Sequence, residues 1–125
     1  MRTNLFLDTN VVIYALQGKK HIASIIEGEK LYISFISEIE LLSWPTLNSE
    51  DEGLVSEFIS GCQIVEYSSR LKEIVIDFRK PYKLKMSDAF VAASAFQFEM
   101  LLVSADPAFS RIKEIEFFLV KPHQS

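Results

Sequence analysis

At 125 residues the chain has the length of one domain with a single core, and we expect one domain over residues 1–125. The composition, 49% hydrophobic and 24% charged, excludes a disordered chain, and no apolar run approaches the ~20 residues of a membrane span. The net charge of −4 argues against a protein held on nucleic acid by bulk positive charge. It does not argue against an enzyme whose acidic site binds a metal, because the charge of the metal is missing from the count.

The hydrophobic pattern predicts strands that alternate with helices along the chain. We expect strands at 4–8, 31–35, 62–67, 100–103 and 116–120. We expect helices at 10–17, 19–27, 37–44, 51–60, 69–80 and 87–98, and a helical turn at 107–112. This alternation predicts an α/β fold with a central, mostly parallel five-stranded sheet covered on both faces. The helix that Ser87 opens is rich in small apolar residues and should be buried.

Four acidic residues follow predicted strands or lie near the start of predicted helices: Asp8, Glu40, Asp88 and Asp106. Taken singly, each suits a helix cap. Glu40 lies three residues after Ser37, as in a capping box, and the other three fit an N-cap or the first turn, where the helix dipole favours a carboxylate.

Taken together, the four acids favour a shared site. In a parallel sheet the carboxyl ends of the strands meet at one edge, where ligands bind. Carboxylates gathered there without basic neighbours in sequence repel one another, and a hard cation such as Mg²⁺ or Mn²⁺ relieves that repulsion. A metal site therefore explains the set better than four separate caps. Asn10 and Ser104 are either supporting polar residues of that site, where they would bind the metal's waters, or turn and cap residues.

The segments around these acids also carry a family resemblance. They read "LFLDTNVVIYAL" around Asp8, "ISFISEIELL" around Glu40, "KMSDAFVAASA" around Asp88, and "LLVSADPAF" around Ser104 and Asp106. In this order and spacing they resemble the motifs of PIN-domain ribonucleases, and among these the small VapC-type toxins of prokaryotic toxin–antitoxin pairs. The resemblance covers essentially the whole chain and implies a PIN-like three-layer α/β/α fold.

The resemblance implies a function as well. It implies an endoribonuclease dependent on Mg²⁺ or Mn²⁺ that hydrolyses RNA phosphodiester bonds with metal-activated water, with the four acids as catalytic residues and metal ligands. It further implies the toxin of a type II pair, with a cognate antitoxin, a homodimer, and tRNA or rRNA as reasonable substrates. The single Cys62 allows no disulfide within the chain, so we expect a cytoplasmic protein that associates with no membrane.

The sequence departs from the family motif, or leaves a choice of residue, at two positions. Glu38 offers a second acid beside Glu40, and Glu40 is preferred because Leu41 follows it as in the family motif. Trp44-Pro45 stands where many relatives carry a small residue, which indicates a differently shaped edge of the substrate groove.

A basic stretch, "FRKPYKLK", leads to Asp88. Its Arg79, Lys80, Lys83 and Lys85 could follow an RNA backbone, with Tyr82 stacking a base. The alternative interpretation is a solvated helix end, where the dipole favours basic side chains.

Two other enzyme classes are excluded because the sequence lacks a residue that each requires. A haloacid-dehalogenase-type phosphatase needs an acid where Asn10 stands, and a response-regulator receiver needs an Asp in "CQIVEYSS", which has none. His21 and His123 are expected to be solvated, which argues against a histidine-based ribonuclease. The remaining alternative is a non-catalytic PIN-like module that binds RNA or protein.

Overall fold

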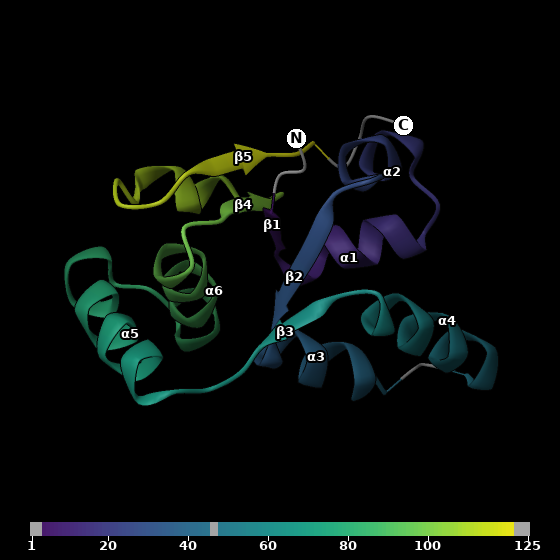
Figure 1. The fold of residues 1–125 in the computed structure, drawn as a ribbon, viewed down its shortest axis with the longest axis horizontal. Coiled ribbons are helices and arrows are strands. Elements are labelled where there is room, and N and C mark those ends of the chain that lie inside the picture. The colour runs from purple at the N-terminus through teal and green to yellow at the C-terminus, as the bar shows by residue number, and fades with distance from the viewer. Residues whose placement is uncertain (1–3, 46–47, 122–125) are drawn as a thin grey trace.

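The computed structural model describes residues 4–45 and 48–121 and contains one five-stranded sheet (Figure 1). The strand order is β3-β2-β1-β4-β5, and all four neighbouring pairs are parallel. The strands are β1 (Asn4–Leu7), β2 (Lys30–Ser34), β3 (Gln63–Val65), β4 (Leu101–Ser104) and β5 (Phe117–Leu119). The predicted α/β class is confirmed, and the sheet is parallel throughout its described strands rather than only mostly so.

Helices fill the connections between the strands. They are α1 (Thr9–Leu16), α2 (Lys20–Ile26), α3 (Phe35–Leu42), α4 (Ser49–Ser60), α5 (Ser69–Tyr82), α6 (Met86–Gln97) and the 3-10 helix η1 (Pro107–Arg111). Thr46, in the polar sequence before α4, lies outside the described residues. The helix from 51 begins two residues earlier, at Ser49, because the side chain of Asn48 accepts a hydrogen bond from the Asp51 amide at 2.8 Å.

Two other helix boundaries differ from the prediction for physical reasons. α3 begins at Phe35 because Ser34, not Ser37, is its N-cap: Ser34 Oγ accepts a hydrogen bond from the Ile36 amide at 3.0 Å. α5 continues through Pro81 to Tyr82, two residues beyond its predicted end. A proline costs a helix one backbone hydrogen bond, and in the last turn few further bonds are at stake.

The sheet separates two apolar cores, because alternate side chains of a strand point to opposite faces. Phe6 of β1 and Leu102 of β4 pack with α5 and α6. Leu7 and Val103, one residue further along the same strands, pack with α1, α2, α3 and α4. Figure 1 shows α5 and α6 on one side of the sheet and α1, α2 and α4 on the other. This arrangement is the expected three-layer α/β/α fold.

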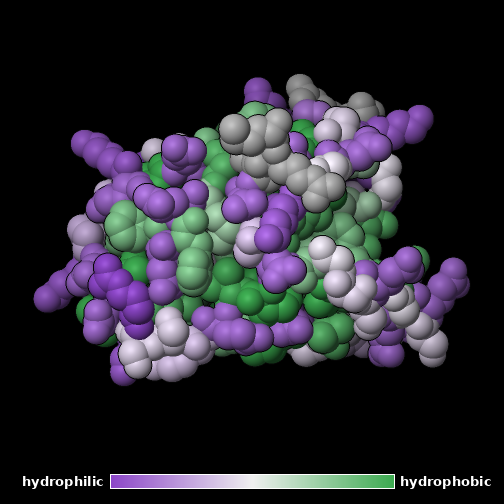
Figure 2. Space-filling model, in the orientation of Figure 1, coloured by the Kyte–Doolittle hydropathy of each residue, from purple (hydrophilic) through white to green (hydrophobic). Residues whose placement is uncertain are grey.

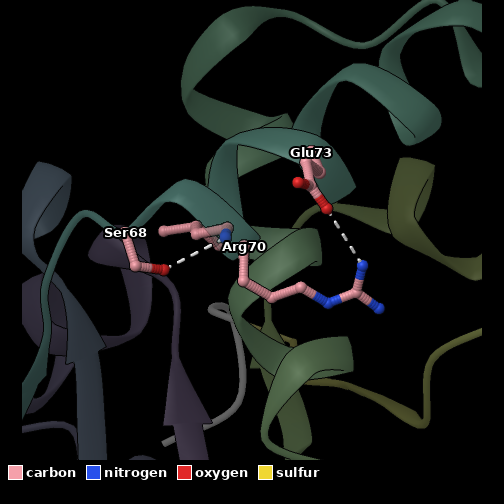
Figure 3. A network of polar contacts seen from close by, with 4 residues as sticks. Ser68, Arg70 and Glu73 are labelled. Carbon is pink, nitrogen blue, oxygen red and sulfur yellow. Dashed lines mark hydrogen bonds and ion pairs between the residues drawn. The ribbon is translucent and has the colours of Figure 1, made fainter.

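α6 packs next to α5 and is largely buried, as expected from its small residues. Six of its residues are buried: Ala89, Val91, Ala92, Ala93, Ser94 and Ala95. Figure 3 shows the start of the neighbouring α5, where Ser68 Oγ accepts a hydrogen bond from the Leu71 amide at 3.1 Å and Arg70 lies 3.4 Å from Glu73. That ion pair lies within α5, is exposed and adds little stability. α5 and α6 pack together through buried apolar residues such as Leu71 and Ala92.

The surface is mixed. Figure 2 shows an apolar area near the centre of the face toward the viewer, with polar side chains around it. None of the described helices is long and apolar enough to cross a membrane.

Candidate active site

Asp8 lies at the junction of β1 and α1, in the middle of the carboxyl edge of the sheet. Its amide donates a hydrogen bond to the carbonyl of Val103 in β4 at 3.0 Å. One carboxylate oxygen, Oδ1, accepts from the Thr9 amide at 2.8 Å, so Asp8 is the N-cap of α1. The other oxygen, Oδ2, accepts from Ser104 Oγ at 2.7 Å. Asp8 therefore caps a helix and also faces the strand that leads to Asp106.

Ser104 and Asn10 fasten this junction to the loop after β4. Ser104 is completely buried, and its Oγ accepts a hydrogen bond from the Asp106 amide at 3.0 Å while donating to Asp8. Asn10 Oδ1 accepts from the Ala105 amide at 3.2 Å. Both side chains thus hold the acids in place, and the buried Ser104 is directed at Asp8 rather than at solvent.

Glu40 lies in the second turn of α3, and its contacts differ from those of a capping box. Its Oε1 lies 2.8 Å from Thr9 Oγ1, and the same Thr9 hydroxyl lies 2.8 Å from Ser37 Oγ. The capping-box interpretation of Ser37 and Glu40 is wrong, because Ser37 lies inside α3, completely buried. Glu40 lines the same cleft as Asp8, and Glu38 does not.

Asp88 and Asp106 complete the set of acids. Asp88 lies in the first turn of α6, and its carboxylate has no hydrogen bond with any residue in the described part of the chain. Asp106 is the N-cap of η1, since its Oδ1 accepts from the Ala108 amide at 2.9 Å. Asp106, like Asp8, is therefore both the N-cap of a helix and a residue of the cleft.

The four acids line one cleft of about 290 Å³ at the carboxyl edge of the sheet. They come from four separate places in the fold: the β1–α1 junction, α3, α6 and the start of η1. The other residues that line the cleft are Thr9, Asn10, Ile13, Ser87 and Val91. The sequence interpretation missed Thr9, and it assigned Ser37 to a capping box with Glu40 rather than to a contact with Thr9.

The electrostatics of the cleft are those of crowded carboxylates. Burial raises the pKa of Asp8, the hydrogen bonds from Ser104 and Thr9 offset part of this, and the charges of Asp88 and Asp106 raise it further. Burial and the charges of Asp106 and Glu40 likewise raise the pKa of Asp88. Lys85 lowers the pKa of Asp88, so the cleft does have one basic neighbour, contrary to the expectation from sequence.

The cleft offers the donors that a hard cation prefers, namely carboxylate oxygens with little compensating charge. In the described residues no lysine or arginine forms a salt bridge with any of the four acids. Across residues 4–45 and 48–121 no three His, Cys, Asp or Glu side chains already stand close enough to hold a metal ion. Several of the carboxylate oxygens are instead engaged by their own neighbours, such as Thr9 and Ala108. The donor set therefore fits Mg²⁺ or Mn²⁺ in charge and chemistry, and binding would require the carboxylates to draw together.

The basic stretch before α6 divides into two parts. Arg79 Nε donates a hydrogen bond to the carbonyl of Leu84 at 3.0 Å, which closes the turn between α5 and α6. Lys80, Lys83 and Lys85 are exposed beside it. None of the four basic residues lines the cleft. Lys85 nevertheless acts on one of the acids, because its charge lowers the pKa of Asp88.

Tyr82 is partly exposed and joins the end of α5 to the segment before β5. Its hydroxyl donates to Glu114 Oε1 at 2.5 Å and accepts from the Lys113 amide at 3.3 Å. Its ring packs edge-to-face against Phe78, with 6.3 Å between the ring centroids. These contacts give Tyr82 a structural role, and the base-stacking role stays a prediction. Of the two histidines, His21 is half-buried in α2, away from the cleft, and His123 lies outside the described residues.

Comparisons with known proteins bear on the family. A family model described as PIN domain matches residues 5–115. No curated protein matches the chain significantly. Among solved structures, a toxin–antitoxin complex from Klebsiella pneumoniae has 23% identity and a TM-score of 0.80, covering 97% of this chain and 99% of that one.

Two further structures have the same fold. VapBC2 from Rickettsia felis, bound to a DNA fragment from its promoter, has 19% identity and a TM-score of 0.84, and the match covers 94% of this chain and 98% of that one. FitAcB from Neisseria gonorrhoeae has 19% identity and a TM-score of 0.76, over 94% of this chain and 97% of that one. At these identities the similarity to the solved structures establishes only the fold. The match to the family model establishes the family. With nearly the whole chain inside the match, this protein belongs to the PIN-domain family.

Proposed function

We propose that this protein is an endoribonuclease dependent on Mg²⁺ or Mn²⁺ that acts as the toxin of a toxin–antitoxin pair. The observation that carries the proposal is the convergence of Asp8, Glu40, Asp88 and Asp106 in one cleft. Four mutually repelling carboxylates at the carboxyl edge of a parallel sheet are costly to keep without a ligand, and a divalent cation offsets that cost. Membership of the PIN-domain family supports the same chemistry.

The four acids would hold the cation. A bound divalent cation supplies charge that stabilises the phosphate oxygens during attack by water and lowers the pKa of that water. Ser104 and Thr9 keep Asp8 and Glu40 in place through the hydrogen bonds described above. The exposed Lys80, Lys83 and Lys85 lie on the approach to α6, where ammonium groups can bind the RNA backbone.

The toxin role is supported by the solved structures of similar fold, whose descriptions name toxin–antitoxin and VapBC complexes. A groove of about 250 Å³ between α1, α3 and α4 offers apolar surface for a protein partner, and its lining includes the partly exposed Trp44 and Leu54. We place the protein in the cytoplasm with its RNA substrate, tRNA or rRNA, and infer a homodimer and a cognate antitoxin. The test of the partner is co-purification with the product of the adjacent reading frame.

The test of the activity is cleavage of a structured RNA in the presence of Mn²⁺. We expect wild-type protein to cut, Asp8→Asn to remain folded by circular dichroism but lose cleavage, and EDTA to stop the reaction. Asp77→Asn is the matched control, because Asp77 is an exposed acid on α5 outside the cleft. RNA binding without cleavage by the wild type would favour the alternative, a non-catalytic RNA- or protein-binding module. Cooperative unfolding of Asp8→Asn would favour a capping role alone.

A further inference from the structure

The hydroxyl of Thr9 lies between two side chains of α3. Thr9 Oγ1 is 2.8 Å from Glu40 Oε1 and 2.8 Å from Ser37 Oγ. A hydroxyl has one proton, and an ionised carboxylate can only accept. The arrangement that satisfies all three groups has Ser37 donating to Thr9 and Thr9 donating to Glu40.

The hydroxyl of Ser37 does not donate to a carbonyl of its own helix. Serines inside helices commonly donate to the carbonyl four residues earlier. Ser94 of α6 does this at 2.7 Å to Phe90, and so does Ser43, the C-cap of α3, at 2.5 Å to Ile39. Ser37 is completely buried, and its hydroxyl contacts Thr9 as its one hydrogen-bond partner within the described residues. The buried hydroxyl is thus committed to the contact with α1.

Glu40 needs such a support more than the other acids do. Its side chain has three rotatable bonds and is exposed, so an unsupported carboxylate would sample many positions. The contact from Thr9 occupies Oε1 and leaves Oε2 without a hydrogen bond to any described residue. The carboxylate is therefore held near the cleft with one oxygen free for a ligand.

We infer that Thr9 and Ser37 are positioning residues that hold Glu40 in the cleft, as Ser104 holds Asp8 on the other side. This inference rests on the proposed function, because it assigns Glu40 a task at the metal. Thr9 begins α1 and Ser37 lies in α3, so the relay also fixes the distance between the two helices that carry Asp8 and Glu40. Orienting partners of metal ligands act in this way, and losing one costs about 10- to 100-fold in metal affinity or activity.

The test compares Thr9→Val, which keeps the branched shape and removes the hydroxyl, with Thr9→Ser, which keeps the hydroxyl. Mn²⁺ affinity is measured by calorimetry without RNA, and kcat and KM are measured with a cleavable RNA. We expect Thr9→Val to weaken Mn²⁺ binding and lower kcat by about tenfold or more with KM little changed, and Thr9→Ser to recover most of the loss. Ser37→Ala should cost less, because Thr9 keeps its own proton for Glu40.

A double-mutant cycle separates positioning from a general effect on the fold. In a Glu40→Gln background Thr9→Val should produce no further loss of Mn²⁺ affinity, because its effect passes through Glu40. Additive losses, or a Thr9→Val protein that is less stable but binds Mn²⁺ like the wild type, would overturn the inference and leave the proposed function standing. A wild type that neither binds Mn²⁺ nor cuts RNA would overturn the proposed function, and the inference with it.

Discussion

At the scale of single residues, the buried hydroxyl of Ser104 joins two acids from opposite ends of the chain. It donates to Asp8 and accepts from the amide of Asp106. Ser104→Ala would leave a mostly buried carboxylate oxygen and a backbone amide without this partner, so we expect the free energy of unfolding in urea to fall by about 1–3 kcal/mol. Ser24→Ala is the control, because Ser24 is exposed and should change stability by less than about 0.5 kcal/mol. Equal stability of both variants would contradict the account of Ser104.

The one cysteine allows a second prediction at this scale. Burial raises the pKa of Cys62 to about 11, and its thiol donates to the carbonyl of Phe58 at 3.5 Å. At pH 8 only about one thiol in a thousand is then ionised, and the thiolate is the reactive form. We expect a disulfide reagent to modify the native protein slowly at pH 8, faster as the pH rises toward 11, and rapidly in urea. Fast modification of the native protein at pH 8 would show that the thiol is not buried.

At the scale of elements, the end of α5 holds a residue in an uncommon conformation. Lys83 has φ of 52°, in the left-handed region that glycine adopts without steric cost. We expect Lys83→Gly to raise the free energy of unfolding by up to about 1 kcal/mol. Lys72→Gly, at an exposed position inside the same helix, should lower it by about 1 kcal/mol. Thermal unfolding measures both, and a loss of stability in both variants would mean that Lys83 makes contacts worth more than its strain.

Some boundaries of the helices and strands could be predicted from the sequence, and others could not. β1 and the acid that follows it were predictable, because a buried apolar run ending in Asp8 has few alternatives. The start of α3 was not, because Ser34 and Ser37 are both good N-caps and only the end of β2 decides between them. The end of α5 was misjudged because proline usually ends a helix earlier.

Part of the candidate site could likewise be predicted from the sequence, and part of it could not. The four acids could be placed at one edge of the sheet from its parallel strands, since Asp8 and Asp106 follow strands and the other two lie near the starts of helices. The contact between Thr9 and Glu40 could not, because it depends on how closely α1 packs beside α3. Which side of α3 faces the cleft, and so the choice of Glu40 over Glu38, likewise follows from packing.

At the scale of the whole molecule, a ligand held by four separate elements should stabilise all of them together. If the proposed metal site is correct, Mn²⁺ at about 100 times its Kd should raise the free energy of unfolding by about 2.7 kcal/mol. EDTA should reverse the effect, and Asp8→Asn should remove it while Asp77→Asn keeps it. Differential scanning fluorimetry with and without Mn²⁺ measures this. An identical midpoint of unfolding for the wild type in both conditions would count against the site.

The central strand of the sheet, β1, precedes the other four strands in the chain. β1 pairs on one side with β2 and on the other with β4, where Leu5 faces Leu101. On the ribosome, β1 and α1 emerge long before β4, and Asp106 emerges later still. The cleft therefore cannot assemble on a nascent chain whose β4 and Asp106 are still inside the exit tunnel. The four acids can meet only after the ribosome has passed Asp106, so a translation product interrupted before Asp106 carries no complete site.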